Sequence, residues 1–335
     1  MKAILITLLV FLFQFSFAQY VPDKLLGGFD VKAKKMAEAP KKVYLNSFKI
    51  YYQMIAEAEK TSYGGRQFGG GSYTGDATAR MAVGVQGVSP DQLQALTNQL
   101  YTKMVTDLES LGLEVLTATD IPSIEYFNEW TTIEGPNINE EQVRGHLMVV
   151  PEGYAYNVKK ITKKGKEKGK GVLGVQTMYA GGPKISSQLE DAIVADVEIH
   201  VPSLWLDASS KLGTAKVKGG SYLRLATASK VDFVYGKLKK PGAPQPKAYI
   251  GTTLKKEVPI NGVFDGEKFK AVATKSRTTV PDYAAFFTVE DREVSLTNYA
   301  ECDGEVYRER VEQTVSEFMD ISLNKLSKSL KGEKY

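Results

Sequence analysis

The sequence predicts an α+β fold, in which a βαβ-like unit with a long amphipathic helix is followed by mostly antiparallel strands and a C-terminal helix. Three observations predict it: an apolar stripe at helical spacing over residues 93–111, alternation of apolar and polar residues over 193–201, and a second helical stripe over 311–330. The chain has 335 residues, of which 43% are hydrophobic and 24% are charged. This composition is typical of a globular protein and excludes collagen-like and wholly disordered chains.

The first 18 residues have the pattern of a signal peptide. Met1 and Lys2 precede an apolar stretch over residues 3–13, and Ala18 ends a small-x-small triplet. The apolar stretch is short for a membrane span, so we expect cleavage after Ala18 rather than a membrane anchor or a buried helix. Gln19 then becomes the first residue, and because it is not a cysteine we expect no lipid anchor. The prediction is an exported protein of the periplasm, the outer membrane or the extracellular space.

A βαβ-like part is predicted over residues 43–150, after a polar lead-in over 19–42. Its first strand covers residues 43–52, which are rich in β-branched, aromatic and other apolar side chains. Six glycines in residues 64–75 predict a loop or a mobile insertion after this strand.

The long helix of this part has clear start and stop signals. Ser89 is a natural N-cap, and Pro90 occupies the first helical position, where its missing N–H has no cost. Gly112 follows the last apolar residue of the stripe and predicts the end of the helix. Residues 113–117 then form a short strand, which completes the βαβ-like unit.

The second part, residues 151–335, is expected to be rich in antiparallel strands and to close with a helix. Long strands are predicted over 193–201 and 223–235. Residues 258–264 and 268–273 flank Asp265-Gly266, a pair that favours a tight hairpin turn. The final helix is predicted over residues 304–330.

Short motifs for cofactors and metals lack the context that their chemistry needs. Residues 169–174 match G-x-G-x-x-G, but a lysine run precedes them instead of a strand, so we interpret them as a basic loop. The glycine-rich residues 64–75 contain no Gly-Lys-Ser/Thr for a phosphate. With one cysteine, Cys302, and no H-E-x-x-H or C-x-x-C, we expect neither a cofactor nor a metal.

A histidine and two carboxylates share one face of the strand predicted over 193–201. Asp196, Glu198 and His200 alternate with its apolar residues, so they could act as a general base and its orienting acid or form a solvated sheet face. The solvated face is the reading that we prefer. Ser322 and Lys325 match the S-x-x-K pattern of acyl transfer, but its companion motifs are missing.

Charge and aromatic residues bear on the partners. A net charge of +4 is too small to predict nucleic-acid binding, although the lysine-rich segments 159–170 and 237–247 could touch an anionic surface. Candidate partner contacts are the aromatic residues Phe68, Tyr73, Trp130 and Trp205. For the two tryptophans, a place in the core is the commoner alternative.

A family resemblance rests on the order of elements over residues 43–52, 91–116, 192–201 and 222–234. This order resembles the periplasmic domain of curli-secretion-channel (CsgG-like) envelope proteins and the related domain at the start of TolB. The aromatic-rich leader that ends in Ala-Gln resembles those of exported Bacteroidetes proteins. The channel family carries a cysteine anchor after its leader and has alternating membrane hairpins, whereas residues 56–88 here are mostly glycine and polar. We therefore predict no pore.

The function that these observations favour is an exported cell-envelope protein for binding, assembly or secretion, without catalysis. Its partner is expected to be a protein or another envelope component, and the chain could form a homo-oligomer. Two alternatives remain, a carboxylate-dependent hydrolase of an envelope polymer and a surface adhesin or matrix component. An enzyme should have a cleft with two or more carboxylates, one with a raised pKa, whereas an assembly module should have an exposed apolar patch or an open sheet edge.

Overall fold

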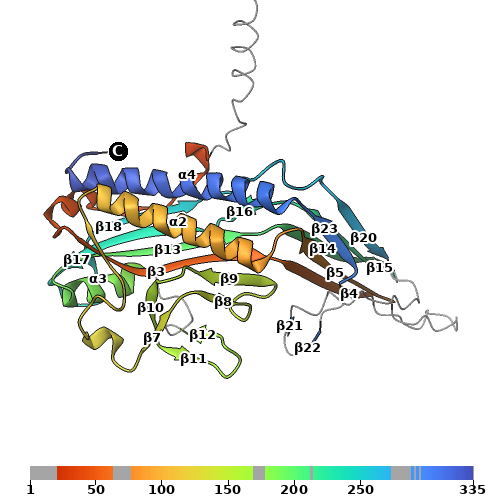
Figure 1. The fold of residues 1–335 in the computed structure, drawn as a ribbon, viewed down its shortest axis with the longest axis horizontal. Coiled ribbons are helices and arrows are strands. Elements are labelled where there is room, and N and C mark those ends of the chain that lie inside the picture. The colour runs from red at the N-terminus through yellow and green to blue at the C-terminus, as the bar shows by residue number, and fades with distance from the viewer. Residues whose placement is uncertain are drawn as a thin grey trace, which may run out of the picture.

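The computed structural model describes residues 21–62, 77–168, 178–211, 214–272, 288–289, 292–293 and 296–334. It confirms the α+β class, with mostly antiparallel sheets and a long C-terminal helix (Figure 1). The chain is organised around one large sheet, with two long helices on one of its faces and a layer of short elements on the other.

The large sheet has nine strands in the order β1-β18-β17-β13-β3-β9-β8, and β2 and β6 add to it beside β18 and β3. The central pair β3–β13 is parallel, as is β3–β6, and the other pairs are antiparallel. The sheet therefore takes strands from both predicted parts of the chain. Its strands are β1 (Leu26–Gly27), β2 (Asp30–Val31), β3 (Lys42–Gln53), β6 (Glu114–Leu116), β8 (Asn137–Asn139), β9 (His146–Val150), β13 (Ile193–Val201), β17 (Lys230–Lys237) and β18 (Pro246–Leu254).

The predicted βαβ unit is present. After β3, the hairpin of β4 (Ile55–Ser62) and β5 (Ala77–Gln86) leads to helix α2 (Pro90–Ser110), and the chain returns to β6 beside β3. Ser89 caps the helix as expected: its Oγ accepts a hydrogen bond from the Gln92 N–H at 3.2 Å, and the Gln92 side chain accepts one from the Ser89 N–H at 2.9 Å. This reciprocal pair is a capping box, so the local sequence defines where the helix begins.

Two long helices, α2 and α4 (Gly304–Leu330), lie side by side on one face of the sheet (Figure 1). Asp303 caps α4 by accepting from the N–H groups of Glu305 and Val306. The predicted bounds of α4 are confirmed. Both apolar stripes are buried in the main core, through Leu93, Leu96, Leu100, Met104 and Leu108 of α2 and Tyr307, Val311, Val315, Phe318, Met319 and Leu326 of α4.

The predicted polar lead-in is part of the folded unit. Its strands β1 and β2 pair with β18, and Met36 is fully buried in the main core. Two short 3₁₀ helices, η1 (Asp23–Leu25) and η2 (Ala33–Glu38), complete this segment.

The opposite face of the sheet is covered by short elements. Helix α3 (Met178–Gln188) lies in the range predicted to be β-rich. The sequence did not predict this helix, because two glycines and Pro183 interrupt its helical pattern. With it this layer contains η3 (Glu125–Phe127), β7 (Thr131–Glu134), β10 (Ala155–Val158), β11 (Lys160–Ile161) and β12 (Glu167–Lys168). Because this layer covers Asp196, the expectation of a solvated face is wrong for this residue, whereas Glu198 and His200 are half-buried.

Two three-stranded sheets form the far end of the molecule (Figure 1). One consists of β14 (Leu204–Lys211), β15 (Thr214–Ser221) and β20 (Lys268–Val272), and the other of β23 (Asn298–Glu301), β5 and β4. They share a small core of alanine, valine, leucine and methionine side chains. A separate two-stranded pair is formed by β21 (Thr288–Val289) and β22 (Arg292–Glu293).

Two predicted strand arrangements are wrong. The strand expected over 223–235 is divided into β16 (Arg224–Leu225) and β17 by a turn. The expected hairpin over 258–273 does not form either: β19 (Val258–Pro259) pairs with β16, and β20 pairs with β15. Gly266 has the positive φ of +76° that the turn prediction required, but strands from elsewhere in the chain pair with both flanking strands.

Candidate functional site

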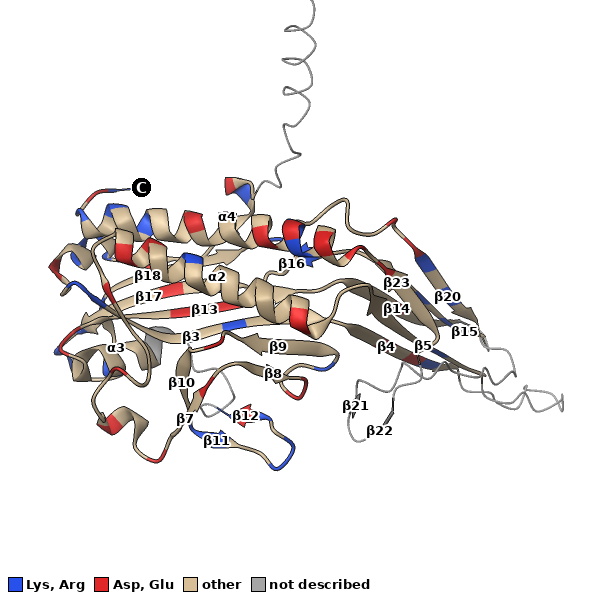
Figure 2. Cartoon of the chain, viewed as in Figure 1, with Lys and Arg blue, Asp and Glu red and all other residues tan. Residues whose placement is uncertain are grey.

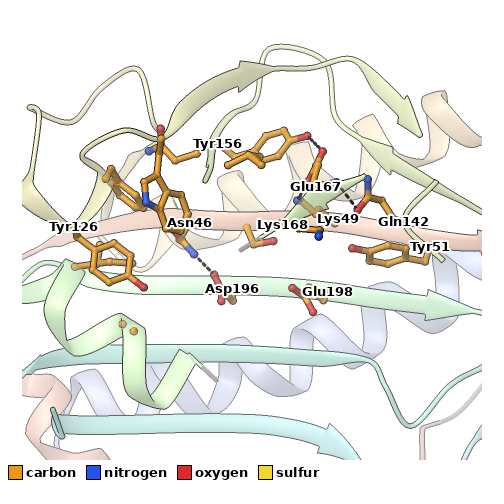
Figure 3. Close-up of a pocket in the computed structure, with 18 residues that line it drawn as sticks. Asn46, Lys49, Tyr51, Tyr126, Gln142, Tyr156, Glu167, Lys168, Asp196 and Glu198 are labelled. Atoms are coloured by element: carbon orange, nitrogen blue, oxygen red, sulfur yellow. Dashed lines mark hydrogen bonds and ion pairs between the residues drawn. The ribbon is translucent and has the colours of Figure 1, made fainter. Parts of the chain in front are cut away.

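A cavity of about 350 Å³ lies between the sheet and the layer of short elements (Figure 3). Strands β3 and β13 form one wall, and η3, β10, β12 and α3 contribute the others. The polar residues labelled in the figure are Asn46, Lys49, Gln142, Glu167, Lys168, Asp196 and Glu198, and the labelled aromatic residues are Tyr51, Tyr126 and Tyr156.

An irregularity in β3 places the first polar pair. The register between β3 and β13 advances from Leu45↔Ala195 to Ser47↔Asp196, so Asn46 is the extra residue of a β-bulge. A bulge redirects the side chain that it inserts. The Asn46 side chain donates a hydrogen bond to Oδ1 of Asp196 at 2.7 Å, as Figure 3 shows.

Asp196 is the most perturbed carboxyl group of the cavity. Its side chain is almost completely buried, and this burial raises its pKa to about 7, against the opposing effect of the Lys230 ammonium. The neighbouring carboxylates Glu198 and Asp232 raise it further, while the hydrogen bond from Asn46 lowers it. Asp196 can therefore donate or accept a proton near neutral pH.

The other carboxylates of this region have cationic or phenolic partners. Glu198 forms an ion pair with Lys230 at 3.2 Å. Glu167 accepts hydrogen bonds from Lys49 and from the Tyr156 hydroxyl, both at 2.6 Å. The Lys49 ammonium also lies 4.3 Å from the centroid of the Tyr156 ring, so this end of the cavity is held in one arrangement.

An aromatic cluster lines the other end. The rings of Tyr126, Phe127 and Trp130 lie 5.2 to 5.7 Å apart between centroids, in tilted and edge-to-face contacts. The indole Nε1 of Trp130 is buried and has no hydrogen-bond acceptor among the described residues. A buried donor without an acceptor among the described residues is costly, and the residue that carries it lines the cavity.

The histidine predicted beside Asp196 has a structural role. The His200 ring stacks on Tyr51 with centroids 4.4 Å apart, and burial lowers its pKa to about 4. It is therefore neutral at physiological pH and is stacked rather than oriented by a carboxylate. Burial likewise lowers the pKa of His146.

The four predicted contact aromatics have different fates. Trp130 lines the cavity, whereas Trp205 lies on β14 at the far end of the molecule and is 40% exposed. Phe68 and Tyr73 lie outside the described residues, as do residues 169–174 of the G-x-G-x-x-G match.

The sequence did not single out Asn46, Lys49 and Glu167 as site residues. One signal was present: apolar residues on both faces of β3 indicate a strand that is covered on both sides, so the polar residues within it must face a buried or partly buried environment.

A second, apolar groove of about 540 Å³ lies at the junction of the large sheet and the far end, lined by Met54, Ile55, Val85, Val88, Ile138, Leu147 and Leu296 among others.

Within the described ranges, no three His, Cys, Asp or Glu side chains are grouped as a metal site would require. In the same ranges, no helix has the length and apolarity for crossing a membrane.

Comparisons with known proteins leave the family open. No protein-family model, no curated protein and no solved structure matches this chain. The resemblance to curli-secretion-channel and TolB proteins therefore stays a prediction from the sequence.

Proposed function

We propose that this chain is an exported cell-envelope protein that binds a hydroxyl-rich ligand, a glycan segment of an envelope polymer, in the cavity between β3, β13 and α3. The observation that carries the proposal is the buried Trp130 Nε1, a donor without an acceptor among the described residues, on the wall of a cavity rich in both aromatic and hydrogen-bonding groups.

The chemistry of the lining suits a sugar. A pyranose ring has apolar C–H faces and a rim of hydroxyl groups that donate and accept hydrogen bonds. The cluster of Tyr126, Phe127 and Trp130 provides aromatic surface, and Asn46 and Asp196 provide groups that can both donate and accept near neutral pH. A few polar groups at fixed positions in a preformed cavity are typical of small-molecule sites.

Binding without catalysis is favoured because two of the three cavity carboxylates are already neutralised. Glu167 is held by Lys49 and Tyr156, and Glu198 by Lys230. Glycoside hydrolysis needs one protonated and one ionised carboxyl on either side of the same bond. Asp196 alone has the near-neutral pKa of a general acid.

The test uses tryptophan fluorescence, since the chain has two tryptophans. In a Trp205→Phe background, Trp130 reports on the cavity alone. We expect a disaccharide-peptide fragment of peptidoglycan to shift this emission, and isothermal titration calorimetry to show about tenfold weaker binding for Trp130→Phe, which loses one hydrogen-bond donor. Trp205→Phe is the matched control and should bind as the wild type does. Failure of envelope glycan fragments to bind at millimolar concentration would contradict the proposal.

The second candidate, a carboxylate-dependent hydrolase, is favoured by the raised pKa of Asp196. It predicts that the bound fragment is cleaved over hours and that Asp196→Asn abolishes the cleavage while binding persists. Mass spectrometry of the incubated fragment separates the two functions: an intact fragment supports binding only, and an Asp196-dependent product supports hydrolysis.

Export and assembly are tested separately from the cavity. Deletion of residues 3–13 should leave the protein in the cytoplasm, because the apolar stretch of the leader is lost. Light scattering on the purified protein tests assembly: a ring-sized oligomer in the outer-membrane fraction supports a secretion accessory, and a soluble monomer contradicts the homo-oligomer. A monomer that adheres to surfaces would favour the adhesin.

A further inference from the structure

The outward face of the sheet β14-β15-β20 carries a group of lysines that the sequence does not show as a run. Strand alternation points Ala215 and Val217 into the small core and Lys216 and Lys218 outward. Lys268 and Lys270 of β20 alternate in the same way with Phe269. Figure 2 shows lysine on β20 at this end of the molecule.

The strand register assembles these residues into one surface. Lys218 pairs with Lys270 on one side and with Asp207 on the other, and Gly220 lies between Trp205 and Lys268. We call this the lysine face and define it by its outward residues Trp205, Asp207, Ser209, Lys216, Lys218, Gly220, Lys268, Lys270 and Val272.

The charge of the lysine face is not neutralised within the described part of the chain. Four ammonium groups share it with one carboxylate, Asp207, and none of the four lysines forms an ion pair with a described carboxylate. Partial desolvation, together with the charges of Lys218 and Lys270, lowers the pKa of Lys216. Like charges at this spacing repel one another, so an anionic partner would stabilise the face.

Two large apolar side chains are exposed at opposite corners of the same face. Trp205 is 40% exposed and Val272 is 44% exposed. The indole of Trp205 lies across β15 because Gly220 has no side chain: a Cβ at Gly220 would come 2.9 Å from the indole Nε1. A basic surface with an exposed indole and an exposed aliphatic side chain matches the headgroup layer of a bilayer, where tryptophan prefers to lie.

We propose that the lysine face docks the protein on a membrane surface rich in anionic phospholipid headgroups. The negative potential of the headgroups attracts the lysines and so contributes to binding, and the exposed indole inserts at the level of the headgroups. The face lies at the opposite end of the molecule from the cavity (Figure 1), so membrane docking leaves the cavity open to ligand.

The experiment measures sedimentation of the purified protein with vesicles of phosphatidylcholine alone or with about 30% phosphatidylglycerol. We expect binding only to the anionic vesicles, with release at high salt, because exposed charges are screened. Lys218→Glu/Lys270→Glu should weaken binding at least about tenfold. The matched control Lys255→Glu/Lys256→Glu changes the net charge equally at two exposed residues between β18 and β19 and should bind as the wild type does.

A second measurement keeps the proposal testable if the charge reversals affect folding. In a Trp130→Phe background, Trp205 emission should shift to shorter wavelength on anionic vesicles, and Lys218→Gln/Lys270→Gln should reduce the shift. Equal binding to both vesicle types, or equal loss in the control double variant, would overturn the proposal. So would binding to a DNA duplex that the face variants lose while vesicles stay unbound, because the face would then recognise nucleic-acid phosphates.

Discussion

Replacement of the buried carboxyl of Asp196 by an amide should change how stability depends on pH. Asp196 is 8% exposed, and burial raises its pKa from 3.8 to about 7. Between these two values the native state binds more protons than the unfolded state, so the free energy of unfolding falls as the pH rises. This difference in pKa corresponds to a loss of at most about 4 kcal/mol in the free energy of unfolding, and about 3 kcal/mol of that loss falls between pH 5 and pH 8.

The histidines act in the opposite direction. Burial lowers the pKa of His200 to about 4, so its unfolded form binds more protons below pH 6.5 and stability rises with pH there. The pH profile of the wild type alone is therefore a sum of opposing effects. The difference between Asp196→Asn and the wild type at each pH isolates the carboxyl group, since the amide oxygen can still accept the hydrogen bond from Asn46.

Urea denaturation followed by circular dichroism measures this difference at about pH 5 and about pH 8, at constant ionic strength. Relative to the wild type, Asp196→Asn should gain between about 1 and 3 kcal/mol of stability as the pH rises over this range. Asp265→Asn, in an exposed loop, is the control for the loss of one carboxylate and should show no such gain. An Asp196→Asn difference that stays constant within about 0.5 kcal/mol at both pH values would refute the raised pKa.

Three further predictions concern the packing of the fold. Leu100→Ala in α2 should cost about 2 to 5 kcal/mol in urea denaturation, because this side chain is 1% exposed in the main core; an unchanged midpoint would mean that the stripe is not core. Ser89→Ala should cost about 1 kcal/mol through loss of the capping box, and Ser89→Asp should restore most of it. Gly87→Ala should cost about 2 kcal/mol or more, because φ is +104° and the new Cβ would come 1.8 Å from the Cys302 carbonyl oxygen; the matched Gly112→Ala, with φ of +77° and open space, should cost less.

The local sequence determined the two long helices and the central strand β3. Ser89 with Pro90, and the stripes of α2 and α4, depend only on neighbours a few residues away, and each predicted helix was confirmed. The strand β3 was likewise predicted from its own residues, because its β-branched, aromatic and other apolar residues indicate a strand despite the polar Asn46 and Lys49. These elements are specified by short-range interactions.

Strand partners and the cavity were decided by the tertiary structure. Gly266 has the positive φ that a tight turn needs, yet β19 and β20 took partners more than 30 residues away in sequence, which no local pattern encodes. Alternation placed Asp196 on a polar face, but only the overlying η3, β10 and α3 show that this face is buried, and burial is what raises its pKa. The lysine face also depends on the tertiary structure, because β15 and β20 lie about 50 residues apart in the sequence and come together only by pairing in one sheet.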